Sequence, residues 1–164
     1  MKIPIKEDFY INSGEKNDVD RRYAVRKFLG KNHKDITEYI KTYSVYGFLE
    51  TISHIGIKAF VYYLDPILSY VKTQSKYWDD DYDNFDGRDI DDHAPLAYGV
   101  LPREIGKKID EYPDEMKKSI NNNLLDFCQW AILNHDNFNK ECFVKENIKK
   151  EYIDLIKKIK DMNI

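Results

Sequence analysis

The fold is decided by the stretch IKAFVYYLDPILSYV, residues 57–71. Its apolar side chains recur three and four residues apart, which is the spacing of one face of an α-helix. The pair Asp65-Pro66 interrupts this pattern. Because proline lacks a backbone N–H and fits the first turn of a helix, the pair predicts either a new helix start or a kink. We expect residues 57–71 to be helical and to be the most buried part of the chain.

Two helices are predicted before this stretch. The first spans residues 19–29 and ends at Gly30, since glycine commonly terminates helices. The second is predicted over residues 35–44, because Asp35 can cap its start and Glu38, three residues later, completes a capping box.

Two more helices are predicted near the C-terminus. The first spans residues 114–134 and has a core-facing stripe formed by Met116, Ile120, Leu124, Phe127 and Ala131. The second spans residues 144–162 and has an inward face formed by Ile148, Tyr152, Leu155 and Ile159.

The residues between these two pairs of helices contain many helix breakers. Proline or glycine occurs five times between residues 93 and 113, at Pro95, Gly99, Pro102, Gly106 and Pro113. This density predicts mostly irregular structure, with one short helix near residues 103–111. No segment alternates apolar and polar residues for long enough to require a sheet.

The overall prediction is an all-α, irregular bundle of about five to seven helices. Residues 1–164 are expected to form a single helical domain, in which residues 1–17 are poorly ordered. Residues 75–113 are expected to form a mostly irregular, acidic loop.

Composition narrows the functional classes. The net charge of −3 and the isoelectric point near 5.8 argue against a nucleic-acid or anionic-membrane partner, because phosphate groups repel an acidic surface. The sequence has no signal-peptide pattern and no apolar run of the ~20 residues needed to span a membrane. We therefore expect a cytoplasmic protein, and we favour a monomer.

Negative charge is concentrated in the segment WDDDYDNFDGRDIDDH, residues 78–93. Eight aspartates and one arginine give this segment a charge of −7, so the remainder of the chain is net positive. The aromatic residues among the aspartates are of the types that anchor protein interfaces. We predict a surface that binds a basic partner, formed by Trp78, Asp79, Asp80, Asp81, Tyr82, Asp83, Phe85, Asp86, Asp89, Asp91 and Asp92. The alternative of an inert, solvated loop carries about equal weight, because runs of charge usually mark solvent.

The acidic segment is also a candidate metal site. If Gly87 takes the glycine position of an EF-hand loop, Tyr82 falls where the first aspartate must be and His93 where the bidentate glutamate must be. This register excludes an EF-hand. A looser site formed by Asp89, Asp92 and His93 stays open, and with it the alternative of a metal-dependent hydrolase. A third alternative is a structural or regulatory protein that self-associates through the aromatic loop.

The remaining chemistry-bearing residues favour a structural interpretation. Cys128 and His135 are two helical turns apart, too far to hold one metal ion without further ligands, and are predicted to be a core cysteine and a helix-end histidine. Cys128 and Cys142 are expected to be free thiols. No phosphate-binding loop, HExxH, CxxC or nucleophile elbow occurs in the chain. We therefore expect no enzymatic activity, no catalytic residues, no bound metal and no cofactor.

Two segments resemble an uncharacterised family of small helical bacterial proteins. In AVRKFLGKNHKDI, residues 24–36, the positions Phe28, Leu29, Gly30 and Lys31 match the family phrase FL-x-GK without the residue at x. In IGIKAFVYYLDPILSYV, residues 55–71, the phrase AF-x-YYLP-x-L is matched by Ala59, Phe60, Tyr62, Tyr63, Leu64, Pro66 and Leu68, with Asp65 inserted before the proline.

This resemblance, which covers about residues 19–134, implies a function but no catalytic residue. Proteins of this kind have no assigned enzymatic activity and resemble the immunity proteins of bacterial toxin–immunity systems, including contact-dependent growth inhibition. Such proteins bind and neutralise a cognate toxin domain, commonly a nuclease. The matching positions are aromatic and aliphatic and are expected to lie in the core.

Overall fold

The computed structural model describes residues 2–10, 19–75, 94–120, 122–136 and 147–162. Within these ranges the chain is all-α: eight α-helices and one short 3₁₀ helix, with no strand. The helix count is higher than the five to seven predicted. The elements are η1 (Lys6–Phe9), α1 (Val19–Phe28), α2 (His33–Thr42), α3 (Val45–Ser53), α4 (Ile57–Gln74), α5 (Ala94–Glu111), α6 (Pro113–Ser119), α7 (Asn122–Leu133) and α9 (Ile148–Asp161).

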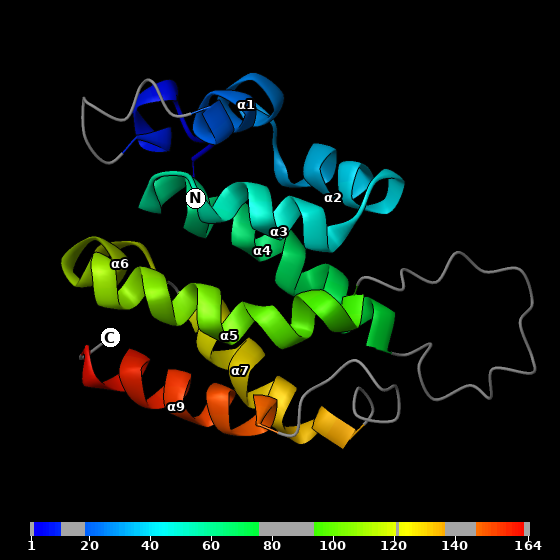
Figure 1. Cartoon of the computed structure of the whole chain (residues 1–164), viewed down its shortest axis with the longest axis vertical. Helices are drawn as coiled ribbons and strands as arrows, with labels where there is room; N and C mark the ends of the chain where they lie inside the picture. The colour runs from blue at the N-terminus through cyan, green and yellow to red at the C-terminus, as the bar shows by residue number, and fades with distance from the viewer. Residues whose placement is uncertain (1, 11–18, 76–93, 121, 137–146, 163–164) are drawn as a thin grey trace, which may run out of the picture.

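Helix α4 forms the centre of the molecule. It is apolar around most of its circumference, and it contacts η1, α2, α3, α5, α6 and α7. Figure 1 shows it between α1 and α2 on one side and α7 and α9 on the other. The prediction that residues 57–71 are deeply buried is confirmed, since Phe60, Tyr63 and Ile67 are all 0% exposed.

Pro66 lies inside α4 and neither ends nor restarts it. A proline in a helix interior removes one backbone hydrogen bond and usually breaks the helix. Here Leu64, Pro66 and Ile67 are all buried, and α4 packs against six neighbouring elements. Tertiary packing therefore offsets the cost of the proline and keeps α4 continuous.

Helix α5 corrects the prediction of mostly irregular structure for residues 94–102 and includes the short helix predicted near residues 103–111, while residues 76–93 lie outside the described residues. It is helical for 18 residues and includes Pro95, Gly99, Pro102 and Gly106. Pro95 lies in the first turn, where its missing N–H costs no intrahelical bond. Gly99 and Gly106 lie beside side chains of α9, and α5 packs against that helix. Burial of one face of α5 outweighs the weak helix propensity of its sequence.

Three further boundaries differ from the predictions. Helix α2 is capped by Asn32 and not by Asp35. The Asn32 side chain accepts hydrogen bonds from the N–H groups of Lys34 and Asp35 at 2.9 and 3.1 Å, and the Asp35 carboxylate accepts one from the N–H of Asn32.

The helix predicted over residues 114–134 is divided, because the backbone is extended at Ile120 between α6 and α7. Asparagines 121–123 follow this point, and asparagine favours turns and caps over helix interiors. The last helix begins at Ile148, and residues 137–146 lie outside the described ranges.

Other predictions are confirmed. Gly30 follows α1 with a φ of 78°, the left-handed conformation that ends a helix. The apolar stripe of α6 and α7 is buried despite the break between these helices, and so is the inward face of α9. The buried apolar side chains form one cluster that receives residues from all eight α-helices.

The N-terminal residues 2–10 pack against this cluster, whereas residues 1 and 11–17 of the segment predicted to be poorly ordered lie outside the described residues. Phe9 is 0% exposed, and its carbonyl accepts a hydrogen bond of 2.9 Å from the N–H of Gly56. Within the described ranges, no helix is both long enough and apolar enough to cross a lipid bilayer.

Candidate functional site

The acidic segment predicted to bind a partner cannot be placed. Residues 78–93, with every predicted contact from Trp78 to Asp92 and the alternative metal ligands Asp89, Asp92 and His93, lie outside the described residues. On either side of this gap, the last described residue is Ser75, just past α4, and the next is Ala94, the first residue of α5. These two points are where the acidic segment joins the helical core.

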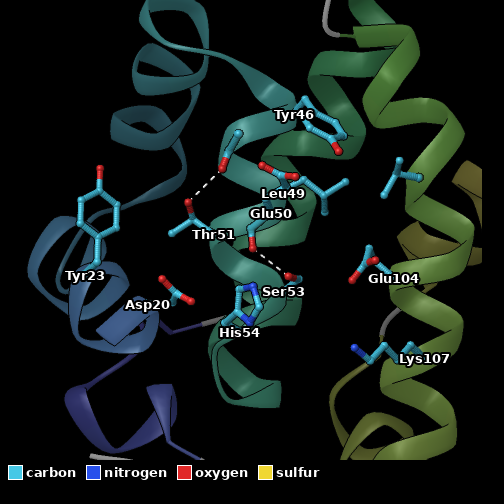
Figure 2. Close-up of a pocket in the computed structure, with 12 residues that line it drawn as sticks. Asp20, Tyr23, Tyr46, Leu49, Glu50, Thr51, Ser53, His54, Glu104 and Lys107 are labelled. Atoms are coloured by element: carbon cyan, nitrogen blue, oxygen red, sulfur yellow. Dashed lines mark hydrogen bonds between the residues drawn. The ribbon is translucent and has the colours of Figure 1, made fainter. Parts of the chain in front are cut away.

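The described residues contain a second acidic surface, a groove of about 510 Å³ over α3. Figure 2 shows α3 in its middle, with α1 on one side and α5 on the other. We call this the α3 groove, and it is lined by Asp20, Tyr23, Tyr46, Gly47, Leu49, Glu50, Thr51, Ser53, His54, Val100, Glu104 and Lys107.

The lining of the α3 groove is polar and net negative. It contains three carboxylates, on Asp20, Glu50 and Glu104, and one lysine ammonium, on Lys107. Apolar aliphatic side chains contribute only at Leu49 and Val100. A cationic group is therefore the complementary ligand for this groove.

The negative charge of the groove changes the pKa of Tyr46. The pKa of its hydroxyl is raised, first because the hydroxyl is hydrogen-bonded to the Glu50 carboxylate and then because of the charge on that carboxylate. Burial and the charge of Glu104 raise the pKa further, and Arg103 opposes them.

The α3 groove keeps its shape because α1 and α5 are both anchored to the turn between α3 and α4. Arg21 of α1 donates from Nε to the carbonyl oxygen of His54 at 2.7 Å. Lys108 of α5 donates from Nζ to the next carbonyl oxygen, that of Ile55, at 3.2 Å. Both cations therefore lie at the C-terminal end of α3, where the helix dipole favours positive charge.

Lys108 is a buried lysine, 6% exposed. Its ammonium lies 5.6 Å from the ring centre of Phe60 and 5.8 Å from that of Tyr112. Burial lowers the pKa of Lys108, and the nearby Glu111 opposes this shift. Its hydrogen bond and its ring contacts are all internal, so Lys108 serves to position α5.

A second cluster of chemistry-bearing side chains lies in the core between α5, α7 and α9. The Tyr98 hydroxyl is 3.1 Å from the carbonyl oxygen of Ala131 and 3.0 Å from Nδ1 of His135. The Tyr152 hydroxyl donates to the Tyr98 carbonyl oxygen at 2.7 Å. Burial lowers the pKa of His135, with Asp136 opposing and Lys149 adding to the shift. Every side chain in this cluster is at least nine-tenths buried, so the cluster joins three helices and offers no surface to a substrate.

Cys128 lies in the same part of the core as a free thiol, and Cys142 lies outside the described residues. Burial raises the pKa of the Cys128 thiol to about 12. The reactive form of cysteine is the thiolate, so this buried thiol is a core residue and not a nucleophile.

Neither the α3 groove nor the buried cluster has the form of a metal site. Within the ranges that the structure describes, no three His, Cys, Asp or Glu side chains are arranged to hold a metal ion.

The sequence alone did not point to the α3 groove. Asp20, Glu50 and Glu104 are isolated charges on three different helices, at separations of 30 and 54 residues. Each has the pattern of an ordinary solvated helix face, so only the fold reveals that they share one surface.

Comparison with known proteins gives no independent assignment. No protein-family model matches this sequence, and no curated protein or solved structure is significantly similar to it.

Proposed function

We propose that this chain is a non-enzymatic, immunity-type protein that binds and neutralises a basic bacterial toxin domain in the cytoplasm. The observation that carries the proposal is the charge of −7 in residues 78–93, where three aromatic residues lie among eight aspartates. A basic partner would neutralise the aspartates, while the rings would supply apolar contact area.

The described residues support this proposal in two ways. The α3 groove adds a second net-negative surface. It is also close to the acidic segment along the chain: Glu104 in the groove is ten positions after Ala94, the residue of α5 that directly follows the segment. At 1.5 Å per residue this distance is about 15 Å, so one protein partner could contact both surfaces.

A direct test is to measure binding between this protein and the product of the neighbouring gene, because immunity genes lie beside the genes of their toxins. The expected result is a tight complex that protects cells against the toxin. Raising the salt from 0.05 to 0.5 M should slow association on the order of tenfold, because screening removes electrostatic steering. Absence of binding, or association that does not respond to salt, would contradict the proposal.

Variants separate the roles of the two residue types in the acidic segment. Replacing Asp79, Asp80, Asp81 and Asp83 by Asn should mainly slow association. Trp78→Ala or Phe85→Ala should mainly speed dissociation, by roughly tenfold, because an aromatic anchor typically contributes over 1 kcal/mol. The control is Asp114→Asn with Glu115→Gln, two exposed acids of α6, which should leave both rates unchanged.

A further inference from the structure

Two carboxylates of the α3 groove have no cationic partner within the described part of the chain. No lysine or arginine nitrogen there lies within 4.0 Å of a carboxylate oxygen of Glu50 or Glu104. Elsewhere, Lys158 contacts Asp110 at 2.6 Å and Lys41 contacts Glu38 at 3.0 Å. The charge of Glu50 and Glu104 is therefore available to a ligand.

The frame around these carboxylates is fixed before any ligand arrives. Arg21 and Lys108 hold α1 and α5 to consecutive carbonyls at the end of α3. Because the Arg21 and Lys108 side chains are themselves buried, these contacts keep the groove open at little entropic cost to a ligand. Ser53 and Thr51 direct their hydroxyls to carbonyls of α3 itself, those of Glu50 and Gly47, as Figure 2 shows.

The composition of the α3 groove discriminates between classes of ligand. Sites for small organic molecules are lined mainly by apolar and aromatic side chains, whereas this groove has mainly polar and charged ones. The described residues also form no metal-binding group. A cationic side chain carried by a protein fits better, because its aliphatic stem can lie against the partly exposed Val100 while its charge meets the carboxylates.

We propose that the α3 groove is a second contact site for the basic protein partner, and that it takes an arginine side chain between Glu50 and Glu104 beside the ring of Tyr46. This inference rests on the proposed function and adds the chemistry of one contact. Arginine suits the site because its planar guanidinium binds carboxylates in a forked geometry and stacks on aromatic rings.

The probe for this site is the peptide acetyl-Arg-Arg-Arg-amide, titrated into the whole ¹⁵N-labelled protein and followed by NMR. The matched control peptide carries citrulline in place of arginine, which keeps the shape and removes the charge. The arginine peptide should shift the backbone signals of the groove, including those of Glu50 and Glu104, and the citrulline peptide should not.

Protein variants test which carboxylates act. Glu50→Gln with Glu104→Gln should weaken peptide binding at the groove by about three- to tenfold, since each variant residue loses one charge pair that is largely screened by solvent. Glu7→Gln with Glu115→Gln removes two exposed acids that do not line the groove and should leave that affinity unchanged. A third variant carries Asn in place of Asp79, Asp80, Asp81 and Asp83. Because it leaves the groove intact, the arginine peptide should still shift the groove signals.

The outcomes separate this inference from the proposed function. Groove signals that do not move, that move equally with citrulline, or that stop moving when the four aspartates are changed would each overturn the groove as an arginine site. The proposed function would survive that result if the neighbouring gene product still binds through residues 78–93. Failure of that protein to bind would instead remove the proposed function itself.

Discussion

The turn between α3 and α4 and the α3 groove lie side by side, yet they differ in whether their charged side chains are bonded within the protein. At the turn, the cations of Arg21 and Lys108 are buried and donate to backbone carbonyls. In the groove, the carboxylates of Glu50 and Glu104 have no cationic partner among the described residues. The same three helices thus carry charges that hold the fold together and charges that are available to bind.

This difference indicates how to separate stability from binding in a protein with no recognisable catalytic motif. A buried charge costs folding free energy unless the protein supplies a partner, so a buried and paired charge is a structural element. An exposed charge contributes little to stability, so it can be changed with little effect on the fold.

The largest effect on stability is expected from Gly56→Ala, which disturbs the packing of the turn between α3 and α4. A Cβ atom at this position would lie 2.5 Å from the carbonyl oxygen of Asp8 and 3.0 Å from the backbone nitrogen of Tyr10. Because backbone atoms cannot move aside easily, the free energy of unfolding should fall by about 2–3 kcal/mol, as measured by urea denaturation. Gly106→Ala, where the nearest atom is 4.0 Å away, is the control and should be neutral or stabilising. Equal effects of the two changes would show that the turn is not tightly packed.

A smaller effect is expected from Arg21→Met, which removes the hydrogen bond from α1 to the His54 carbonyl while keeping most of the side-chain volume. The loss of this charged donor should lower the free energy of unfolding by about 1–2 kcal/mol. The neighbouring Arg22 is exposed on the same helix, so Arg22→Met should change it by no more than about 0.5 kcal/mol. If both variants had equal stability, Arg21 would not be the anchor of α1.

The stability of the protein should depend on pH through His135, a buried side chain of the type that can lose its charge near neutral pH. Its pKa is lowered in the folded state, so below about pH 6.5 the unfolded chain binds a proton that the folded protein does not. Stability should therefore fall as the pH drops from 7 to 5. Asp136, Lys149 and the Tyr98 hydroxyl surround this histidine and set the size of the change.

The measurement for His135 is urea denaturation at several pH values, comparing the wild type with His135→Gln. Subtracting the two curves cancels the other titrating groups, and the wild type should lose more stability on acidification. Parallel curves would mean that His135 titrates alike in the folded and unfolded states.

The smallest effect on stability is expected from Glu50→Gln with Glu104→Gln. Neither carboxylate stabilises an internal cation through an ion pair among the described residues, so the free energy of unfolding should change by no more than about 0.5 kcal/mol. Thermal denaturation followed by circular dichroism would check this. A loss of 2 kcal/mol or more would place these side chains among the structural charges and remove the contrast with the turn.

The sequence predicted the parts of the fold that depend on apolar pattern alone. Helix α4 has so many apolar residues that burial overrides Pro66, and the stripe from Met116 to Ala131 is correct although the helix divides at Ile120. Of helix α5 the sequence predicted only a short part, near residues 103–111, because its prolines and glycines weaken the local signal, while its stability comes from packing against α3, α4 and α9.

The candidate site was predictable only where its residues are contiguous. The acidic segment stands out because its eight aspartates are close together in the sequence. The α3 groove has no such signal, since it is assembled from three helices whose separate charges are individually ordinary. Local charge patterns reveal a contiguous acidic segment, whereas a surface shared by distant helices requires the fold.

The most direct test of the division between structural and binding charges is the affinity of the α3 groove for acetyl-Arg-Arg-Arg-amide in two folded variants. One variant carries Glu50→Gln with Glu104→Gln, and the other carries Glu7→Gln with Glu115→Gln. We expect a dissociation constant about three- to tenfold higher for the first variant than for the second. Equal dissociation constants would contradict it.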